Sequence, residues 1–433
     1  MKKLIGVALA TLFVAGIIAN VAMADDRVQL NGEMRVRYWN TNTLRFSEDG
    51  AVNDNEESWF NQRLRVGTTI NVADGVKVVS RMDFAEGDWG YTADNSSHWP
   101  EDQEIQVDRA YLQVDKGMIG VTAGQQLITL GNAIAYDNNG TGIKLDIKTP
   151  VLITLGYTKE SERDSREDYN DSTNGYTADI DTYLIQLGYA ADMFSVKGFY
   201  AAAKDGLDEG FEPHVFGLQG TFVSGIISVN AELNVFGGDI SGVDVMGTQF
   251  WGNVEAAVMD SLTIGVDLIW SDGNDTDDEM KITALNDWTD WSIMDRGPYV
   301  NDIIPGGASD AMDPVPFGSI PTAVADYIAD DLGIDTFSAE YGAQEGAIGG
   351  GLYAIFTPME GLNLQAEIMY LSAENDDTYD LWNNAQVYSL AAQWFFAPNT
   401  SLSAQYHKTV WDSDYDELDD SSDVIVGQLA VNF

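Results

Sequence analysis

The chain has 433 residues, no cysteine and a formal net charge of −47, with a sequence pI near 4.1. So acidic a chain disfavours binding to nucleic acid, and the absence of cysteine excludes thiolate catalysis and thiolate metal sites. Hydrophobic residues make up 45% of the chain and aromatic residues 11%, which excludes an acidic disordered protein.

The first 24 residues have the pattern of a secretory signal peptide. Lys2 and Lys3 precede the apolar run LIGVALATLFVAGIIA, and the tripeptide AMA ends at Ala24. We expect cleavage after Ala24, because the polar sequence DDR follows; an uncleaved anchor is the alternative, because the apolar run is long. Loss of the two lysines changes the net charge from −47 to −49. No later apolar run reaches the length of about 20 residues that a transmembrane helix needs.

Residues 25–433 alternate apolar and polar side chains in segments of about ten residues, which predicts β-strands. We count eighteen such segments: 28–38, 60–72, 76–85, 105–115, 118–126, 141–148, 151–159, 181–190, 194–203, 214–223, 226–236, 248–259, 262–270, 347–357, 362–372, 384–396, 401–411 and 424–433.

The connections between these segments alternate between short and long. The short ones are centred on 73–75, 115–117, 148–150, 190–192, 224–225, 259–261, 358–361 and 397–399. This rhythm is typical of an all-β, transmembrane antiparallel β-barrel with short periplasmic turns and long extracellular loops. A soluble β-sandwich would not sort its loops in this way. In a barrel surrounded by lipid, the apolar parity faces outward, so Met34, Val36 and Tyr38 are predicted to face the membrane.

The last segment, DVIVGQLAVNF, places apolar residues on one face and ends at Phe433. It resembles the C-terminal strand of Gram-negative outer-membrane proteins, whose final aromatic residue is read by the assembly machinery. The resemblance implies export to the outer membrane, with Phe433 as the assembly signal and the lipid and lipopolysaccharide of that membrane as surroundings.

Residues 109–145 resemble a stretch of the general bacterial porins, on Arg109, Ala110, Tyr111, Gly117, Thr122, Gly124 and Gln126. In those porins the next loop folds into the barrel and narrows it, which makes residues 127–140 the candidate constriction loop. Gln125 stands where such porins often carry arginine, and Asp137 is the only acid of the loop. General porins have sixteen strands, so sixteen is possible here; eighteen fits the substrate-specific porins better.

The charged residues on the inward parity are distributed unevenly. The first four strands carry basic residues, Arg35, Arg37, Arg63, Arg65, Lys77, Arg81 and Arg109, against Glu33 and Asp83. Later strands carry Glu232, Glu255, Asp267 and Glu367. In a ring of eighteen strands these sets face each other, which predicts a basic wall opposite an acidic wall and a transverse field in the pore. The alternative is that these charges only solvate the lumen and pair locally.

The longest predicted loop, 271–346, has three possible roles: a lid, a plug, or a contact for a partner. Its SDGNDTDDE stretch is a weak candidate for calcium, through Asp272, Asp275, Asp277 and Glu279, because the spacing and glycine of an EF-hand loop are missing. Acidic outer loops are most often solvated; divalent cations bridging them to lipopolysaccharide phosphates are the alternative.

The sequence favours a porin, not an enzyme. Its only histidines are His98, His214 and His407, and none lies beside a recognisable nucleophile. We expect passive diffusion of small hydrophilic solutes and ions without a cofactor, and a weak cation preference at low salt from the acidic excess. A channel for anionic or carboxylate-bearing solutes is the alternative, as is a plugged structural or adhesion barrel. The sequence leaves open whether the barrel forms a homotrimer.

Overall fold

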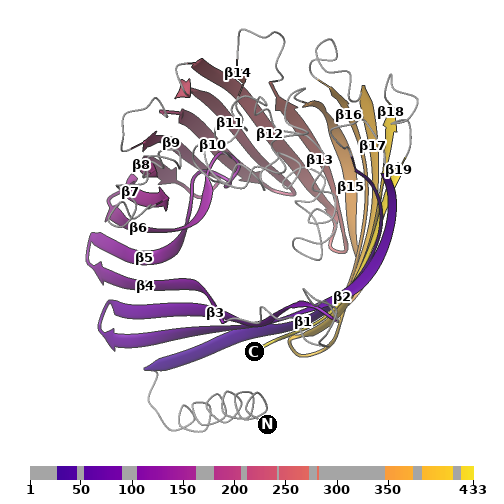
Figure 1. Ribbon diagram of the computed structural model, residues 1–433, viewed down its shortest axis with the longest axis horizontal. Helices are drawn as coiled ribbons and strands as arrows, with labels where there is room; N and C mark the ends of the chain where they lie inside the picture. The colour runs from indigo at the N-terminus through magenta and orange to yellow at the C-terminus, as the bar shows by residue number, and fades with distance from the viewer. Residues whose placement is uncertain are drawn as a thin grey trace, which may run out of the picture.

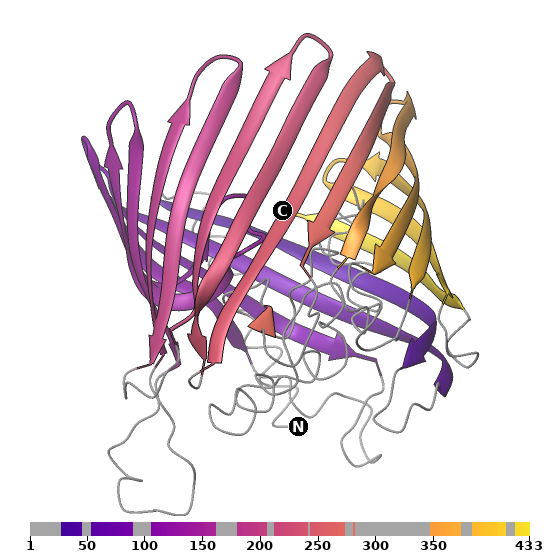
Figure 2. The same cartoon turned by 90° about the horizontal axis from the view of Figure 1, so that it is seen from above.

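The computed structural model describes residues 27–45, 53–89, 105–161, 180–205, 212–240, 243–272, 280–281, 347–373, 383–412 and 421–433. Over these residues the chain forms one closed antiparallel sheet of eighteen long strands, together with a two-residue strand, β14, that pairs in parallel with β12. Figure 1 looks into the ring of strands, and Figure 2 shows them lying inclined side by side. The predicted signal peptide, 1–24, lies outside the described residues.

The strands follow each other around the ring in chain order. The first nine are β1 Val28–Arg45, β2 Asn53–Ala73, β3 Val76–Asp88, β4 Gln106–Lys116, β5 Ile119–Thr129, β6 Asp137–Lys148, β7 Leu152–Ser161, β8 Ile180–Ala190 and β9 Phe194–Asp205. The others are β10 His214–Ser224, β11 Ile227–Ile240, β12 Val243–Met259, β13 Leu262–Ser271, β14 Met280–Lys281, β15 Ala347–Met359, β16 Leu362–Ala373, β17 Asn384–Ala397, β18 Thr400–Asp412 and β19 Ser421–Asn432.

All eighteen predicted strands are present, so the eighteen-strand prediction is confirmed and a barrel of sixteen strands is excluded. The predicted bounds are too short at the ends that lead into the long loops: β1 continues to Arg45 and β2 begins at Asn53. The connection between β11 and β12 spans only 241–242, although a loop of about ten residues was expected. In both strands the apolar alternation ends several residues before the strand does, because the backbone pairing continues beyond the last apolar residue.

The barrel closes where β1 pairs with both β2 and β19. At this seam the Gly32 amide donates to the Phe433 carbonyl at 2.8 Å, and the Phe433 amide donates to the Gly32 carbonyl at 3.0 Å. Closure leaves no strand edge unpaired, which is the condition for a sheet surrounded by lipid. A Cβ atom at position 32 would lie 2.5 Å from the Phe433 ring and 2.4 Å from the Arg65 carbonyl oxygen. Only glycine fits at this position.

We therefore expect the substitution Gly32→Val to prevent stable closure, because the added atoms meet both a ring and a backbone carbonyl. Overpacking of this kind costs about 1–3 kcal/mol or more. The control is Gly427→Val, since Gly427 pairs with Tyr38 across the same seam and a Cβ there would meet nothing within 4 Å. Heat-modifiable mobility on gels reports the closed barrel; equal yields of folded protein for the two variants would contradict the expectation.

The apolar side chains of the sheet face outward. On β15 the neighbours Leu352 and Tyr353 are 57% and 2% exposed, and the same alternation recurs around the ring. The exposed set includes Leu155, Leu187, Leu233, Leu268, Leu390, Leu402 and Leu429. The protein is therefore apolar outside and polar inside, as its alternation predicts. No helix among the described residues is long and apolar enough to cross a membrane.

The short turns lie at one end of the ring, where the arcs between paired strands are visible in Figure 2. The eight predicted short connections are all present, each with two or three residues between consecutive strands. Gly75, Gly117, Gly225 and Gly361 have φ values between +59° and +78°, which tight hairpins require and glycine adopts without strain. The glycines therefore allow tight hairpins at this end of the barrel.

Candidate functional site

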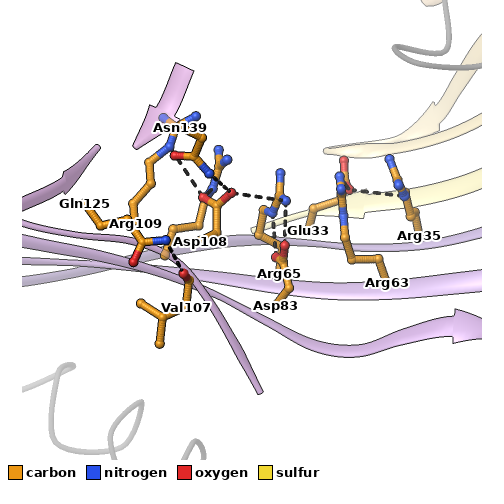
Figure 3. A network of polar contacts seen from close by, with 11 residues as sticks. Glu33, Arg35, Arg63, Arg65, Asp83, Val107, Asp108, Arg109, Gln125 and Asn139 are labelled. Atoms are coloured by element: carbon orange, nitrogen blue, oxygen red, sulfur yellow. Dashed lines mark hydrogen bonds and ion pairs between the residues drawn. The ribbon is translucent and has the colours of Figure 1, made fainter. Parts of the chain in front are cut away.

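A row of arginines lies on the inner face of β1–β4 (Figure 3). We call Arg35, Arg37, Arg63, Arg65, Arg81 and Arg109 the arginine row. The register places Arg35 directly opposite Arg63, and Arg81 directly opposite Arg109. Like charges directly opposite each other destabilise a sheet, so this arrangement needs counter-charges close by.

Two predicted acids supply part of this counter-charge. Glu33 lies 3.1 Å from the Arg63 guanidinium and 4.0 Å from that of Arg35. Asp83 accepts two hydrogen bonds of 2.6 Å from Arg65, in the two-pronged geometry that is strong between guanidinium and carboxylate. Asp83 is thus a buried partner of Arg65, at 4% exposure, and contributes little acidic surface of its own.

The third counter-charge is Asp108, which the sequence analysis did not identify. Its carboxylate contacts Arg81 and lies 3.4 Å from Arg109 and 3.8 Å from Arg65. Alternation would place Asp108 on the outer face, because Arg109 is on the inner one. The register between β3 and β4 shifts at this point: Arg81 pairs with Arg109, but Met82 pairs with Val107. Asp108 is therefore the extra residue of a β-bulge, which turns its side chain inward.

We expect the substitution Asp108→Asn to increase anion preference about twofold, because one unit charge about 8 Å from a passing ion changes its energy by about 0.5 kcal/mol in water. Asp115→Asn is the control: Asp115 is on the same strand but pairs with Lys148 at 2.5 Å near the short turns. Reversal potentials in a salt gradient measure the effect. The same reversal potential for both variants would show that Asp108 does not influence the ion selectivity of the pore.

Two of the predicted basic residues, Arg37 and Lys77, differ in exposure from the arginines at the centre of the cluster. Arg37 is 1% exposed, donates to Gln428 at 2.7 Å and lies 5.8 Å from the Trp39 ring centroid. Lys77 is opposite Asn71 and Gln113 at the short-turn end and is exposed. The arginines with partly exposed heads at the centre of the cluster are Arg65, Arg81 and Arg109, with side chains 21–27% exposed.

The segment predicted as the constriction loop forms a hairpin that leaves the wall. Pairing of β5 with β4 ends at Gln125, and pairing of β6 with β7 begins at Thr141. Residues 126–140 contain pairs only with each other among the described strand pairings, from Gln126 opposite Gly140 to Thr129 opposite Asp137. We call residues 126–140 the inner hairpin. Its turn, 130–136, contains side chains that are almost fully buried, among them Leu130, Ile134 and Tyr136 at 1% exposure.

Polar contacts hold the tip of the inner hairpin against distant strands of the barrel. The Gly131 amide donates to Gln186 of β8 at 3.1 Å, and its carbonyl accepts from Lys197 of β9 at 3.0 Å. The Asn132 amide donates to Glu232 of β11. These strands are three, four and six places along the ring from β5, so the hairpin folds into the interior of the barrel instead of following the wall (Figure 1).

The other side of the inner hairpin meets the arginine row. Asn139 donates to Asp108 at 3.1 Å, as Figure 3 shows. Gln125, one of the two predicted constriction residues, donates to the Val107 carbonyl at 2.7 Å and lies where the hairpin leaves β4. Asp137, the other, is the first residue of β6 and lies inside the hairpin. Asp108, which binds Arg81, therefore connects the hairpin to the arginine row.

Glu232, Glu255 and Asp267 lie on β11–β13, across the ring from β2–β4 (Figure 1), and Glu367 lies on β16, between those strands and the seam; most of these acids are buried. Glu232, Asp267 and Glu367 are 1%, 0% and 6% exposed. Alternation predicts the direction of a side chain but not what covers it, so the low exposure of these three could not be predicted from the sequence.

Neutral donors bind several of these carboxylates. Asp267 accepts from Asn253 at 2.8 Å, and Glu255 accepts from the Tyr353 hydroxyl at 2.6 Å. Glu232 accepts from the side chain of Asn234 at 3.0 Å, besides the hairpin amide. Hydrogen bonds to a carboxylate offset the cost of burying its charge. Glu232 accordingly has a structural role in holding the inner hairpin.

Apolar residues on the inner parity were also missed. Leu184, Phe199, Ala201 and Val215 alternate inward on β8–β10 and are at most 5% exposed. A Cβ at Gly131 of the hairpin would lie 2.7 Å from the Phe199 ring, so the tip packs directly on this patch. These strands have apolar residues on both parities, and this pattern is the sequence signal that could have identified the inward apolar patch.

Part of the predicted calcium site lies outside the described residues, namely Asp275, Asp277 and Glu279 together with 282–346 of the long loop. Asp272 is described, and its amide donates to the Thr248 carbonyl at 2.9 Å. Within the described ranges, no three potential ligands among His, Cys, Asp and Glu gather as a metal site would require.

A closed antiparallel barrel of eighteen long strands, apolar outside, charged inside and crossed by an inward hairpin, has the fold of the porins. A scan of family models and a search of curated proteins found no match to the chain.

Solved structures with this fold are similar to the chain over most of its length. OccAB2 of Acinetobacter baumannii has 10% identity and a TM-score of 0.57, with 94% of this chain and 98% of that chain covered. A BenF-like porin from Pseudomonas fluorescens Pf-5 has 12% identity and a TM-score of 0.55, with 94% and 99% covered. OccK2 (OpdF) of Pseudomonas aeruginosa, solved in complex with glucuronate, has 10% identity and a TM-score of 0.55, with 94% and 98% covered. At such identities the likeness establishes the fold.

Proposed function

We propose that the protein is a porin of the Gram-negative outer membrane, through which small hydrophilic solutes and ions diffuse passively. The observation that carries the proposal is that Asp108 joins the arginine row to the inner hairpin inside a closed barrel. Five of the six arginines, all except Arg37, pair with three carboxylates among the described side chains. A protein interior keeps such a cluster when a polar path runs past it.

The solute path runs between the arginine row and the exposed side of the inner hairpin. The partly exposed heads of Arg65, Arg81 and Arg109 line one side, where fixed charges act on a solute with little reorganisation. Glu232, Glu255 and Asp267 lie on strands across the barrel, so the row and these opposite acids together produce a transverse field. The field favours hydrophilic and dipolar solutes over apolar ones. This transport needs no cofactor.

A channel with a preference for anionic or carboxylate-bearing solutes is the second candidate. The burial of Glu232, Asp267 and Glu367 favours it, because the arginine row is then the more accessible of the two charged sides. Guanidinium groups bind carboxylates in two-pronged geometry, and successive arginines offer successive sites. OccK2, which shares the fold, was solved in complex with glucuronate.

Liposome swelling tests the proposal. Vesicles that contain the refolded protein are expected to swell in glucose and in glucuronate, which are of nearly equal size. Faster swelling in glucuronate supports the preference for carboxylates, and equal rates support the general porin. Protein-free vesicles are the control. Vesicles that swell in neither solute would overturn the proposal and favour a plugged structural or adhesion barrel.

We further infer that residues 1–24 direct export and are removed, and that Phe433 is read during assembly into the membrane. The pairing of Phe433 with Gly32 at the seam supports a role for the last residue in closure. The segment 271–346 remains the candidate lid or plug. A homotrimer is compatible with the apolar outer face.

A further inference from the structure

Two side chains of the barrel wall hold one peptide group at the tip of the inner hairpin. The carboxamide of Gln186 accepts from the Gly131 amide at 3.1 Å, and the ammonium of Lys197 donates to the Gly131 carbonyl at 3.0 Å. Both residues are partly exposed, and neither makes another hydrogen bond with the described residues. A carboxamide has two donor hydrogens and an ammonium has three, so both side chains keep donors that the hairpin does not use.

Lys197 differs from other lysines of the wall because it has no carboxylate partner among the described residues. Lys116, Lys144 and Lys148 each pair with an aspartate, with 2.5–3.8 Å between ammonium and carboxylate. Glu232 also contacts the tip, but it is buried and its carboxylate accepts from a hairpin amide. A positive charge on the inner wall without a counter-charge raises the local concentration of anions.

The carboxamide of Gln219 lies beside Lys197 with its oxygen unused. Lys197 of β9 is directly opposite Gln219 on β10 and Gly188 on β8, and the glycine brings no side chain to that flank. Gln219 is 2% exposed and donates to Asn230 at 2.9 Å, but its Oε1 atom is buried and accepts no hydrogen bond from the described residues. A buried amide oxygen without a donor is costly, so this position favours a ligand that brings a hydroxyl group.

We call Gln186, Lys197 and Gln219 the tip subsite. They lie on three neighbouring strands, β8, β9 and β10 (Figure 1), and Lys197 is closer to the short turns than the inward Phe199 is. The inner hairpin thus has positive charge at both ends, the arginine row at its base and Lys197 at its tip. The spare donors of Lys197 and Gln186 suit the oxygens of a carboxylate, and the Gln219 oxygen suits a neighbouring hydroxyl group.

We propose that the tip subsite binds hydroxy acids during their passage, with Lys197 and Gln186 donating to the carboxylate and Gln219 accepting from the adjacent hydroxyl group. This inference rests on the porin function proposed above and narrows the class of solute. It assigns a binding role to residues outside the arginine row.

The test is channel conductance in planar bilayers with sodium lactate as the only salt, at rising concentration, and again with sodium propionate. Propionate is the same three-carbon acid without the hydroxyl group. Conductance saturates when a permeant ion is bound, so the wild type is expected to saturate at a lower concentration of lactate than of propionate. Lys197→Gln should raise the half-saturating lactate concentration about fivefold, the effect of one unit charge about 4 Å away in water.

Three further variants separate charge, hydroxyl recognition and position. Lys144→Gln is the matched control, because Lys144 is also on the inner face but pairs with Asp146 at 3.8 Å, and it should keep the wild-type value. Lys197→Arg keeps the charge and should retain most of the binding. Gln219→Met keeps the length of the side chain and should remove the difference between lactate and propionate.

Potassium chloride conductance of each variant reports the width of the pore. If Lys197→Gln changes the conductance of all three salts alike, the lysine only holds the hairpin and the inference is overturned. An unchanged half-saturating lactate concentration in Lys197→Gln, or an equal rise in Lys144→Gln, would overturn it as well. Linear lactate conductance in a wild-type channel that conducts potassium chloride would overturn the tip subsite and leave the porin function intact. Absence of conductance in every salt would contradict the porin function and, with it, the tip subsite.

Discussion

Replacing residues 127–139 by the dipeptide Asn-Gly is expected to raise single-channel conductance about twofold or more, because pore cross-section governs ion flow. Gln126 and Gly140 are paired in register, so a two-residue turn joins them; β5 and β6 lose only their hairpin ends, 127–129 and 137–139, and keep the residues that pair with β4 and β7. The shortened hairpin no longer reaches Gln186, Lys197 or Glu232. The barrel wall keeps all of its strands.

A single substitution at the tip perturbs the same hairpin less than the deletion does. Gly131 has a φ of +57°, and a Cβ there would lie 2.3 Å from the Glu232 carboxylate. Gly131→Val should therefore displace the tip and give a conductance between those of the wild type and the deletion. Gly198→Val on β9 is the control, since its Cβ would meet nothing within 4 Å. Wild-type conductance in the deletion would mean that the inner hairpin does not narrow the pore.

Changing Arg35, Arg63 and Arg81 together to Gln is expected to move ion selectivity toward cations by about five- to tenfold in permeability ratio. Each unit charge about 8 Å from the path contributes about 0.5 kcal/mol in water, and salt with a screening length of about 10 Å at 0.1 M reduces the sum. The glutamines keep the length and polarity of the wall. We also expect the difference in selectivity between the variant and the wild type to disappear at high salt.

The control for this triple variant removes three positive charges elsewhere, by changing Lys116, Lys148 and Lys204 to Gln. These side chains are 47–57% exposed and pair with acids at the ends of the barrel. Net charge falls equally in both variants, so any difference between them reports position. Equal selectivity in the two variants would assign the effect to total charge and not to the arginine row.

The architecture was predictable from the sequence because two simple signals repeat eighteen times. Period-two alternation marks each strand, and the parity of loop length separates the two ends of the barrel. Tyr353 beside Leu352 illustrates how directly the alternation translates into inside and outside. The ends of strands were less predictable, as for Arg45 and Asn53, because pairing outlasts the apolar pattern.

The site was predictable only in part, since it depends on departures from regularity. The arginine row follows from parity, but Asp108 faces inward only because a bulge shifts the register after Arg81. The bounds 127–140 came from a resemblance and agree with where pairing to β4 and β7 stops. The contact of Glu232 with Asn132 joins residues a hundred positions apart, and no local pattern encodes it.

The most direct measurement is the reversal potential in planar bilayers, in a salt gradient, for three proteins: wild type, Asp108→Asn, and the triple Arg35, Arg63 and Arg81→Gln variant. If the arginine row and its partner Asp108 set selectivity, all three proteins conduct. The two variants then shift in opposite directions, Asp108→Asn toward anions and the triple variant toward cations. Conducting channels with the same reversal potential in all three would contradict the account of the interior. Absence of conductance in the wild type would contradict the porin itself.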